Sequence, residues 1–235
     1  MTRVMADLRG AVVDALRTVR DPELDESVVD LGFVTSSTVD GGHAEVRLRL
    51  PTYFCAPNFA YLMVADAFDA VRAVPGISGV SIRLEDHFAS DEINSGVAVG
   101  AGFVGSFPDE AAAELDDLRR DFLRKTHVAA MERACRRLLA DGWTIESLPQ
   151  ARLADLPDGA ERSRLLRRRA DIDLPLTPGS RVLVGDDGAP VAPDDVPLRL
   201  RFAQAVRVSI DGNAHFCRGL LATRYSESAV EEDSA

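Results

Sequence analysis

Residues 33–50, FVTSSTVDGGHAEVRLRL, decide the fold class, because they have the pattern of two short strands joined by a tight turn. Alternate positions from Ala44 to Leu50 are apolar and the positions between them are polar, as in a strand with one buried face. The Asp-Gly-Gly segment at residues 40–42 supplies the positive φ angles that a tight turn needs. The stretch therefore predicts an antiparallel hairpin.

Helices flank this hairpin on both sides. Apolar residues recur at helical spacing over residues 3–19, and Pro22 ends that pattern. A second apolar helical face runs from Pro57 to Val74, and residues 80–84 alternate as a third strand. The order predicts an α+β fold: a small α-β-β-α-β domain with its helices on one face of the sheet.

Composition divides the remainder of the chain into further parts. The expected order is the α+β domain at 1–94, a Gly-rich linker at 95–107, a helical region at 108–173, a small β-rich region at 174–226 and an acidic tail at 227–235. In the β-rich region, residues 198–210 and 214–222 suggest two strands around an Asp-Gly-Asn turn.

Charge and hydropathy exclude several classes of partner. The 235 residues carry 27 basic and 38 acidic side chains, a net charge of −11, which argues against nucleic acid or an anionic membrane surface. No stretch approaches the roughly 18 consecutive apolar residues of a membrane span, and the first ten residues, MTRVMADLRG, lack the apolar core of a leader. We expect a cytoplasmic protein with neither partner.

Cys55 is the strongest candidate for chemistry, because it stands between the second strand and the second helix. A thiol at a helix N-terminus meets unpaired N–H groups that lower its pKa and favour the reactive thiolate. The alternative is a buried cysteine that acts as a small apolar side chain. Cys135 and Cys217 could each be core residues; the sequence leaves open whether they contribute to a site, and nothing in it assigns them a ligand role.

Four segments together point to a family. They are DPEL at 21–24, VVDLGF at 28–33, the TYFC turn at 52–55 and VPGI at 74–77. In this order they resemble the SufT/PaaD-like metal-sulfur cluster assembly factors, and the resemblance covers about residues 8–94. It implies a factor that matures iron-sulfur or iron-dependent client proteins and is not an enzyme in the usual sense.

The resemblance also implies roles for individual residues. Cys55 would be the functional thiol that contacts metal, cluster or client, supported by Asp21, Glu23 and Thr52. Iron or an iron-sulfur cluster would be held transiently, because one thiolate supplies too few ligands for a permanent site. For Asp21 and Glu23, the turn rules alone give an equal alternative, namely helix termination and a solvated turn.

The sequence departs from the family pattern in two places. Ala56 follows the cysteine where the family has proline, and the segment after the third strand carries His87 and Asp91 as further candidate metal ligands. A surface position is the ordinary alternative for such a histidine. The residues beyond 94 suggest docking of one client, such as an iron-dependent oxygenase, and a homodimer would bring two Cys55 thiols to one metal.

Two other interpretations stay open beside the family resemblance. The protein could be an adaptor or assembly chaperone in which Cys55 is structural, or Cys55 could be a nucleophile whose base the sequence does not locate.

Residues 100–105, GAGFVG, match the dinucleotide-binding pattern G-x-G-x-x-G. No βαβ unit surrounds them, so they favour a hinge over a dinucleotide site.

Overall fold

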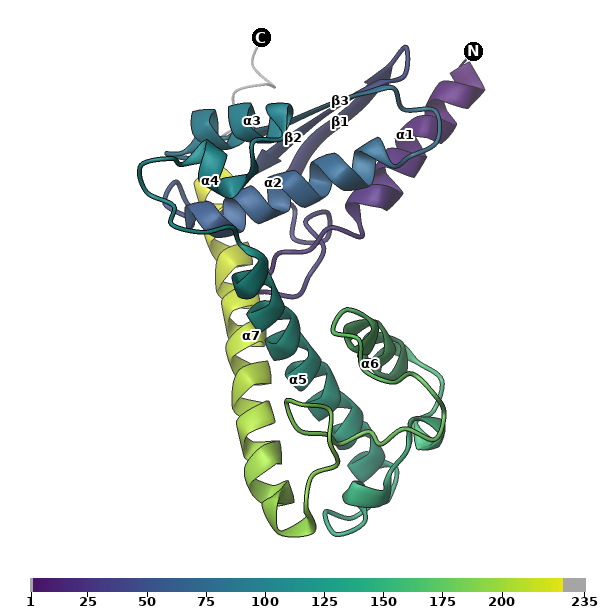
Figure 1. Ribbon diagram of the computed structural model, residues 1–235. Helices are drawn as coiled ribbons and strands as arrows, with labels where there is room; N and C mark the ends of the chain where they lie inside the picture. The colour runs from purple at the N-terminus through teal and green to yellow at the C-terminus, as the bar shows by residue number, and fades with distance from the viewer. Residues whose placement is uncertain (1, 226–235) are drawn as a thin grey trace. The chain divides into compact units, whose positions relative to one another are not determined.

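The computed structural model describes residues 2–225 and divides into two compact units (Figure 1). Unit 1 consists of Met1–Asp116 together with Asn213–Ala235, and unit 2 is Asp117–Gly212. The chain therefore leaves unit 1, forms unit 2 and returns. None of the helices in the described part of the chain is both long and apolar enough to cross a membrane.

Unit 1 contains the predicted α-β-β-α-β order. Its elements are α1 (Thr2–Leu16), β1 (Val34–Asp40), β2 (His43–Arg49), α2 (Pro57–Arg72) and β3 (Gly79–Glu85). The sheet order is β1-β2-β3, with β1 antiparallel to β2 and β2 parallel to β3. A parallel pair needs a crossover, and α2 provides it. The prediction of an α+β fold is confirmed.

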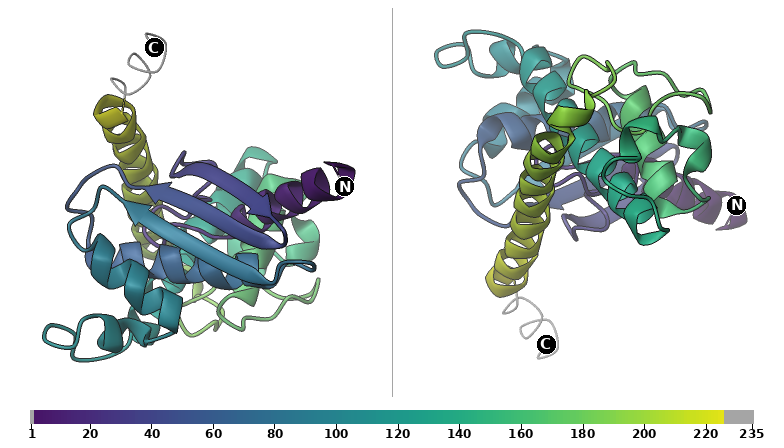
Figure 2. Two further views of the ribbon diagram at one scale, coloured as in Figure 1. Left: turned by 90° about the horizontal axis from the view of Figure 1, so that it is seen from above. Right: turned by 90° about the horizontal axis from the view of Figure 1, so that it is seen from below.

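The sheet buries one face and exposes the other. Helices α1 and α2 pack on the same side of the strands, and Figure 2 shows the three strands lying over α2. Val46 and Leu48 of β2 point into the core on that side and are fully buried. On the opposite side Arg47 and Arg49 form ion pairs with Glu85 at 3.0 and 3.3 Å. This alternation is the one that residues 43–50 predicted.

The prediction of a Gly-rich linker at residues 95–107 is wrong, because this stretch is mostly helical. Helices α3 (Ser90–Val99) and α4 (Gly102–Ser106) follow β3 directly. Gly100 takes a left-handed conformation, with φ of 67°, and ends α3. A Cβ added at Gly96 would lie 1.8 Å from the Ser106 hydroxyl oxygen, so glycine allows α3 and α4 to approach closely here. The small residues serve packing instead of flexibility.

Asn94 of α3 completes the outer edge of β3. Its side-chain oxygen accepts a hydrogen bond from the Leu84 N–H at 2.8 Å, and its side-chain nitrogen donates to the Leu84 carbonyl at 3.0 Å. Leu84 is buried, so these backbone groups are shielded from water. The Asn94 side chain thus makes the two backbone hydrogen bonds that a neighbouring strand would otherwise make at this position.

Unit 2 is helical. Its main elements are α5 (Asp116–Ala140), α6 (Ala160–Ala170) and the first part of α7 (Val196–Tyr225), with short 3-10 turns at Leu148–Gln150, Leu153–Asp155 and Pro193–Asp195. Helices α5 and α7 are joined by a largely buried ion pair between Arg207 and Glu132, at 2.6 Å. The helical region predicted at 108–173 is thus present, although its first long helix begins only at Asp116.

The β-rich region predicted at residues 174–226 is wrong, because most of it is helix α7. The buried positions of this segment, Val196, Ala203, Ile210 and Ala214, are separated by seven or four residues, which is the helical repeat. Its content of Val, Phe and Ile resembles that of strands. The segment nevertheless forms a helix, because its apolar residues at helical spacing pack into the core. The predicted acidic tail at 227–235 lies outside the described residues.

A buried histidine is the least expected polar group of unit 2. His127 of α5 is 2% exposed, and its Nε2 atom has no hydrogen-bond partner. Burial lowers its pKa to about 4, with the positive charges of Arg169 and Arg199 acting in the same direction and Asp186 opposing them. His127 is therefore neutral in the folded protein at neutral pH.

We expect Asn94→Ala to lower the free energy of unfolding by about 1–3 kcal/mol, because it leaves both buried Leu84 backbone groups without partners. Urea unfolding followed by circular dichroism measures this. Ser95→Ala is the matched control, because Ser95 is exposed and bonds only carbonyls of its own helix. Equal stability of the two variants would contradict the role assigned to Asn94.

We expect acid to destabilise unit 2 through His127. An unfolded histidine titrates near 6.5 and the folded one near 4, so the unfolded state binds more protons between these values. The contribution of His127 to the free energy of unfolding is fully present above pH 6.5. It falls by about 3 kcal/mol by pH 4. Comparing unfolding at pH 7 and pH 4, His127→Leu should lose this part of the pH dependence, whereas His215→Gln, at an exposed position, should keep it.

Candidate functional site

Cys55 lies in the loop that connects β2 to α2, as the sequence predicted. Ala56 caps α2, and Pro57 is its first residue. The Cys55 side chain is half-buried and packs against the core of unit 1. The next residues in the site come from three other segments, the loop after α1, the loop after β3 and the end of α7.

The expected low pKa of Cys55 is wrong. Burial, together with the smaller effects of the charges of Asp21, Cys217 and Glu23, raises the pKa of the thiol from 9.0 to about 12. A hydrogen bond from the Ala56 N–H acts in the opposite direction but is the weaker influence. The thiol is therefore protonated at neutral pH. Such a thiol is a poor nucleophile, yet it still becomes a ligand when a metal displaces its proton.

Asp21 shapes a turn, as one alternative from the sequence had it, but the Asp21 side chain in that turn is buried and not solvated. Its Oδ1 atom accepts hydrogen bonds from the backbone N–H groups of Glu23 and Leu24, at 2.8 and 2.9 Å, so it shapes the turn after α1. The same carboxyl is only 6% exposed and acts electrostatically on Cys55. Burial raises its pKa to about 6.

Cys217 is the site residue that the sequence analysis missed. It lies in the part of α7 that belongs to unit 1, one turn after Asn213, whose side-chain amide donates to Glu23 at 3.2 Å. Burial raises its pKa, and Asp21 and Glu23 raise it further. The signal was present as the helical spacing of Asn213, Cys217 and Leu221, which becomes visible only once the segment is known to be a helix.

His87 positions the Cys55 loop. Its Nε2–H donates to the Cys55 carbonyl at 2.7 Å, and its Nδ1 accepts from the Ala89 N–H at 3.2 Å. Burial lowers the pKa of His87, which agrees with a neutral ring. Both ring nitrogens are thus occupied by backbone groups. The observed contacts are those of a residue that orients the loop.

Thr52 and Asp91 are the other two residues that the sequence predicted for the site. Thr52 is half-buried in the same loop as Cys55, whereas Asp91 is exposed on α3 and lines a shallow hollow with Phe68 and Asn94. Among residues 2–225, no three His, Cys, Asp or Glu side chains converge in a group that could hold a metal ion. Metal or cluster binding here must draw ligands from elsewhere as well.

An exposed aromatic patch, made of Tyr53, Phe54 and Phe88, borders the site. Its ring centroids lie 5.0 Å apart for Tyr53 and Phe54 and 6.2 Å apart for Phe54 and Phe88. Phe54 is 78% exposed and the other two rings are 46% exposed. The Phe88 N–H donates to the Tyr53 carbonyl at 3.2 Å, which ties the two loops of the patch together.

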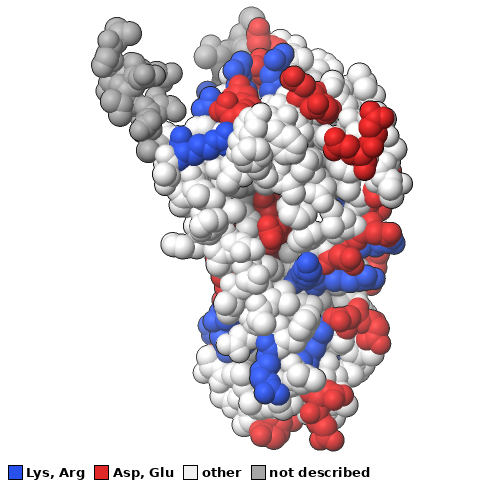
Figure 3. All heavy atoms as spheres, turned by 90° about the vertical axis from the view of Figure 1, so that its left-hand side faces the viewer, with Lys and Arg blue, Asp and Glu red and all other residues white. Residues whose placement is uncertain are grey.

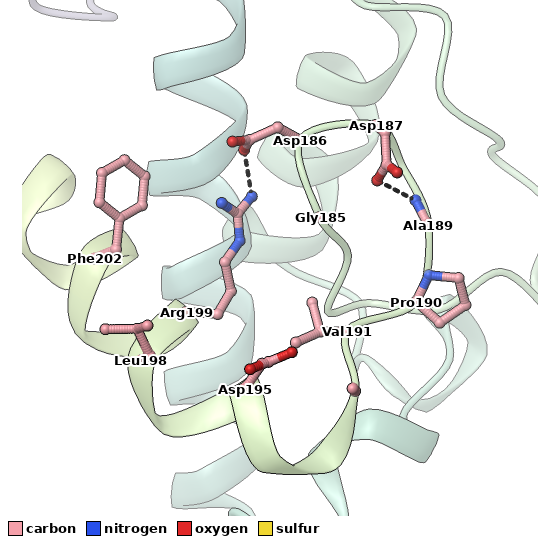
Figure 4. Close-up of a pocket in the computed structure, with 11 residues that line it drawn as sticks. Gly185, Asp186, Asp187, Ala189, Pro190, Val191, Asp195, Leu198, Arg199 and Phe202 are labelled. Atoms are coloured by element: carbon pink, nitrogen blue, oxygen red, sulfur yellow. Dashed lines mark hydrogen bonds and ion pairs between the residues drawn. The ribbon is translucent and has the colours of Figure 1, made fainter.

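Unit 2 has a pocket of its own, about 720 Å³ in volume (Figure 4). Arg199 pairs with Asp186 at 2.7 Å on one wall, and Leu198 and Phe202 of α7 form an apolar wall. Its volume falls in the range of small-ligand sites. The sequence analysis singled out none of these residues.

Charged side chains of both signs lie on one face of the protein (Figure 3). On the face shown in Figure 3, acidic and basic side chains are interspersed, and the described residues of that face form no extended basic surface.

Comparison with known proteins identifies the first unit. Residues 9–84 match the family described as iron-sulfur cluster assembly protein. An uncharacterized protein of Methanocaldococcus jannaschii is 32% identical over 84 residues, which are 35% of this chain and 86% of that protein.

Two iron-sulfur cluster carrier proteins are also similar. The one from Synechocystis is 34% identical over 74 residues, 32% of this chain, and the one from Deinococcus radiodurans is 31% identical over 124 residues, 50% of this chain. The matched parts are only 20% and 35% of those two carriers. The resemblance of the N-terminal segments is thus confirmed, and the chain belongs, through its first unit, to the iron-sulfur cluster assembly protein family.

Proposed function

We propose that this protein is a maturation factor that takes iron or an iron-sulfur cluster at Cys55 and passes it to a client metalloprotein. The observation that carries the proposal is the half-buried Cys55 thiol beside the carboxyl groups of Asp21 and Glu23, in a unit of the cluster assembly family. The cluster is cargo in this proposal. It has no permanent place in the protein.

The electrostatics of the site suit temporary binding. Burial, with a smaller effect from the acidic neighbours, keeps the empty thiol protonated, and the negative charge of these neighbours attracts an iron cation when it arrives. Because few protein ligands converge at the site, the bound metal keeps coordination positions that sulfide or a client cysteine can occupy. Release to a client then needs no unfolding of the site.

The aromatic patch gives the client a place to dock next to the cargo. Exposed aromatic rings are common anchors at protein interfaces, because they bury much apolar area with little loss of side-chain freedom. Tyr53 and Phe54 immediately precede the functional thiol. Unit 2 lies outside the family match at residues 9–84, and we propose that it selects the client, an iron-dependent oxygenase or a protein of that kind.

A second candidate function is an adaptor or assembly chaperone that binds no metal. The pocket of unit 2, with Leu198 and Phe202 exposed on its apolar wall, favours it, because such a surface can hold a segment of a client. In that case Cys55 is only part of the core, and its removal leaves client maturation intact.

Cys55→Ala should hold at least tenfold less iron and sulfide than the wild-type protein after anaerobic reconstitution with ferrous iron and sulfide. Loss of the thiolate ligand is the physical reason. Absorption spectra and metal analysis give the result. Cys135→Ala is the matched control, because Cys135 is buried in the core of unit 2, and it should load normally. Equal loading of Cys55→Ala and wild type would favour the adaptor.

Phe54→Ser should slow cluster transfer to an apo-ferredoxin acceptor by roughly 5–30-fold, which is the effect of losing about 1–2 kcal/mol of docking energy. The amount of iron loaded should not change. Val99→Ser is the control, because Val99 is equally exposed, at 79%, but lies at the end of α3. The same transfer rate in both variants would show that the aromatic patch does not dock the acceptor.

A further inference from the structure

The end of α7 is held against the loops of unit 1 that carry the site. Asn213 donates to Glu23, and Arg218 pairs with Glu26 in the same loop. Further along the helix, Arg224 donates to the Leu50 carbonyl at 3.1 Å and to the Asp86 carbonyl at 2.6 Å. These contacts fix residues 213–225 over the loop after α1 and over the starts of the two loops that contain Cys55 and His87.

One face of this helical segment points into the core of unit 1. Ala214 is 2% exposed, and Leu221 packs so close to Gly32 that a Cβ added there would lie 3.4 Å from its methyl carbon. Cys217 lies between them at three and four residues, on the same face. Its position is therefore set by contacts on both sides along the helix.

Cys217 and Cys55 share their surroundings. Both side chains are half-buried and pack against the same hydrophobic core. Both also experience the charges of Asp21 and Glu23, and Cys217 influences Cys55 electrostatically. Two thiols from segments far apart in the sequence thus pack against one core and experience the charge of one buried carboxyl group.

We propose that Cys55 and Cys217 form a single two-thiol site that binds the iron-sulfur cargo, or one thiophilic divalent cation, within one chain. This inference rests on the proposed function and assigns its second ligand. Binding forms two metal–sulfur bonds and releases the two thiol protons to water, with no change in oxidation state. The remaining ligand positions stay with sulfide, water or a client thiolate.

The second thiol removes the need for a dimer. With Cys55 alone, two chains would have to share one metal to supply two thiolates. Cys217 supplies the second one from the same chain, on a segment that lies outside the family match at residues 9–84. The two-thiol site is therefore an addition of this chain to the family unit.

Phenylarsine oxide tests the geometry without iron. This reagent captures two neighbouring thiols, forming two As–S bonds and releasing one water. Intact mass of the full chain should show one adduct for wild type and for Cys135→Ala, and none for Cys55→Ala, Cys217→Ala or Cys217→Ser. An adduct that persists in both Cys217 variants, or its absence from wild type, would overturn the two-thiol site. Circular dichroism melting selects the Cys217 variant that keeps the wild-type fold.

Iron loading then separates this inference from the proposed function. After anaerobic reconstitution, Cys217→Ala should retain at least tenfold less iron than wild type, as Cys55→Ala does, and native mass spectrometry should find the wild-type cargo on a monomer. Loss in Cys55→Ala with full loading of Cys217→Ala overturns the two-thiol site and leaves the proposed function standing. Full loading of both variants overturns both proposals. Cargo found only on a wild-type dimer assigns the second ligand to another chain and also overturns the two-thiol site.

Discussion

The parallel pairing of β2 with β3 places the Cys55 loop beside the His87 loop. Two parallel strands cannot be joined by a tight turn, so the chain must leave β2, cross over through α2 and return. The register pairs Arg49 with Glu85, and both loops therefore begin at the same end of the sheet. This is why His87 reaches the Cys55 carbonyl and why Phe88 lies beside Tyr53. A different register would separate the thiol from its neighbours.

Desolvation outweighs the helix N-terminus at Cys55. An exposed charge at a helix end gains about 0.3–1 kcal/mol from the dipole. A pKa raised from 9.0 to about 12 corresponds to roughly 4 kcal/mol against the thiolate. Sequence position shows only the first influence, because the core and the acidic neighbours arrive from distant segments. The result changes the chemistry expected of the thiol, from a nucleophile to a ligand that loses its proton on metal binding.

The elements that the sequence predicted correctly are those in which apolar residues repeat with a clear strand or helix period. Residues 43–50 alternate strictly, and residues 3–19 repeat at helical spacing, so the α-β-β-α-β part of unit 1 could be predicted. Glycine can make a linker flexible or allow two helices to approach closely. The sequence does not distinguish these two uses at Gly96, where α3 approaches α4. In α7, β-branched and aromatic residues obscured a helical repeat. Missing that helix also hid Cys217, because only the helix carries it back to Cys55.

The return of the chain through α7 determines what a functional fragment must contain. A boundary at residue 94, drawn from the family resemblance, keeps Cys55, Asp21 and His87 but removes Asn213, Cys217 and Arg224. Ala214 and Leu221 would then no longer cover the core beside Gly32, and the backbone carbonyls of Leu50 and Asp86 would lose the guanidinium that holds them. The unit recognised by its family motifs is thus smaller than the unit that builds the site. Residues 213–225 hold the loops that carry Glu23, Cys55 and His87, so a fragment without them lacks these contacts.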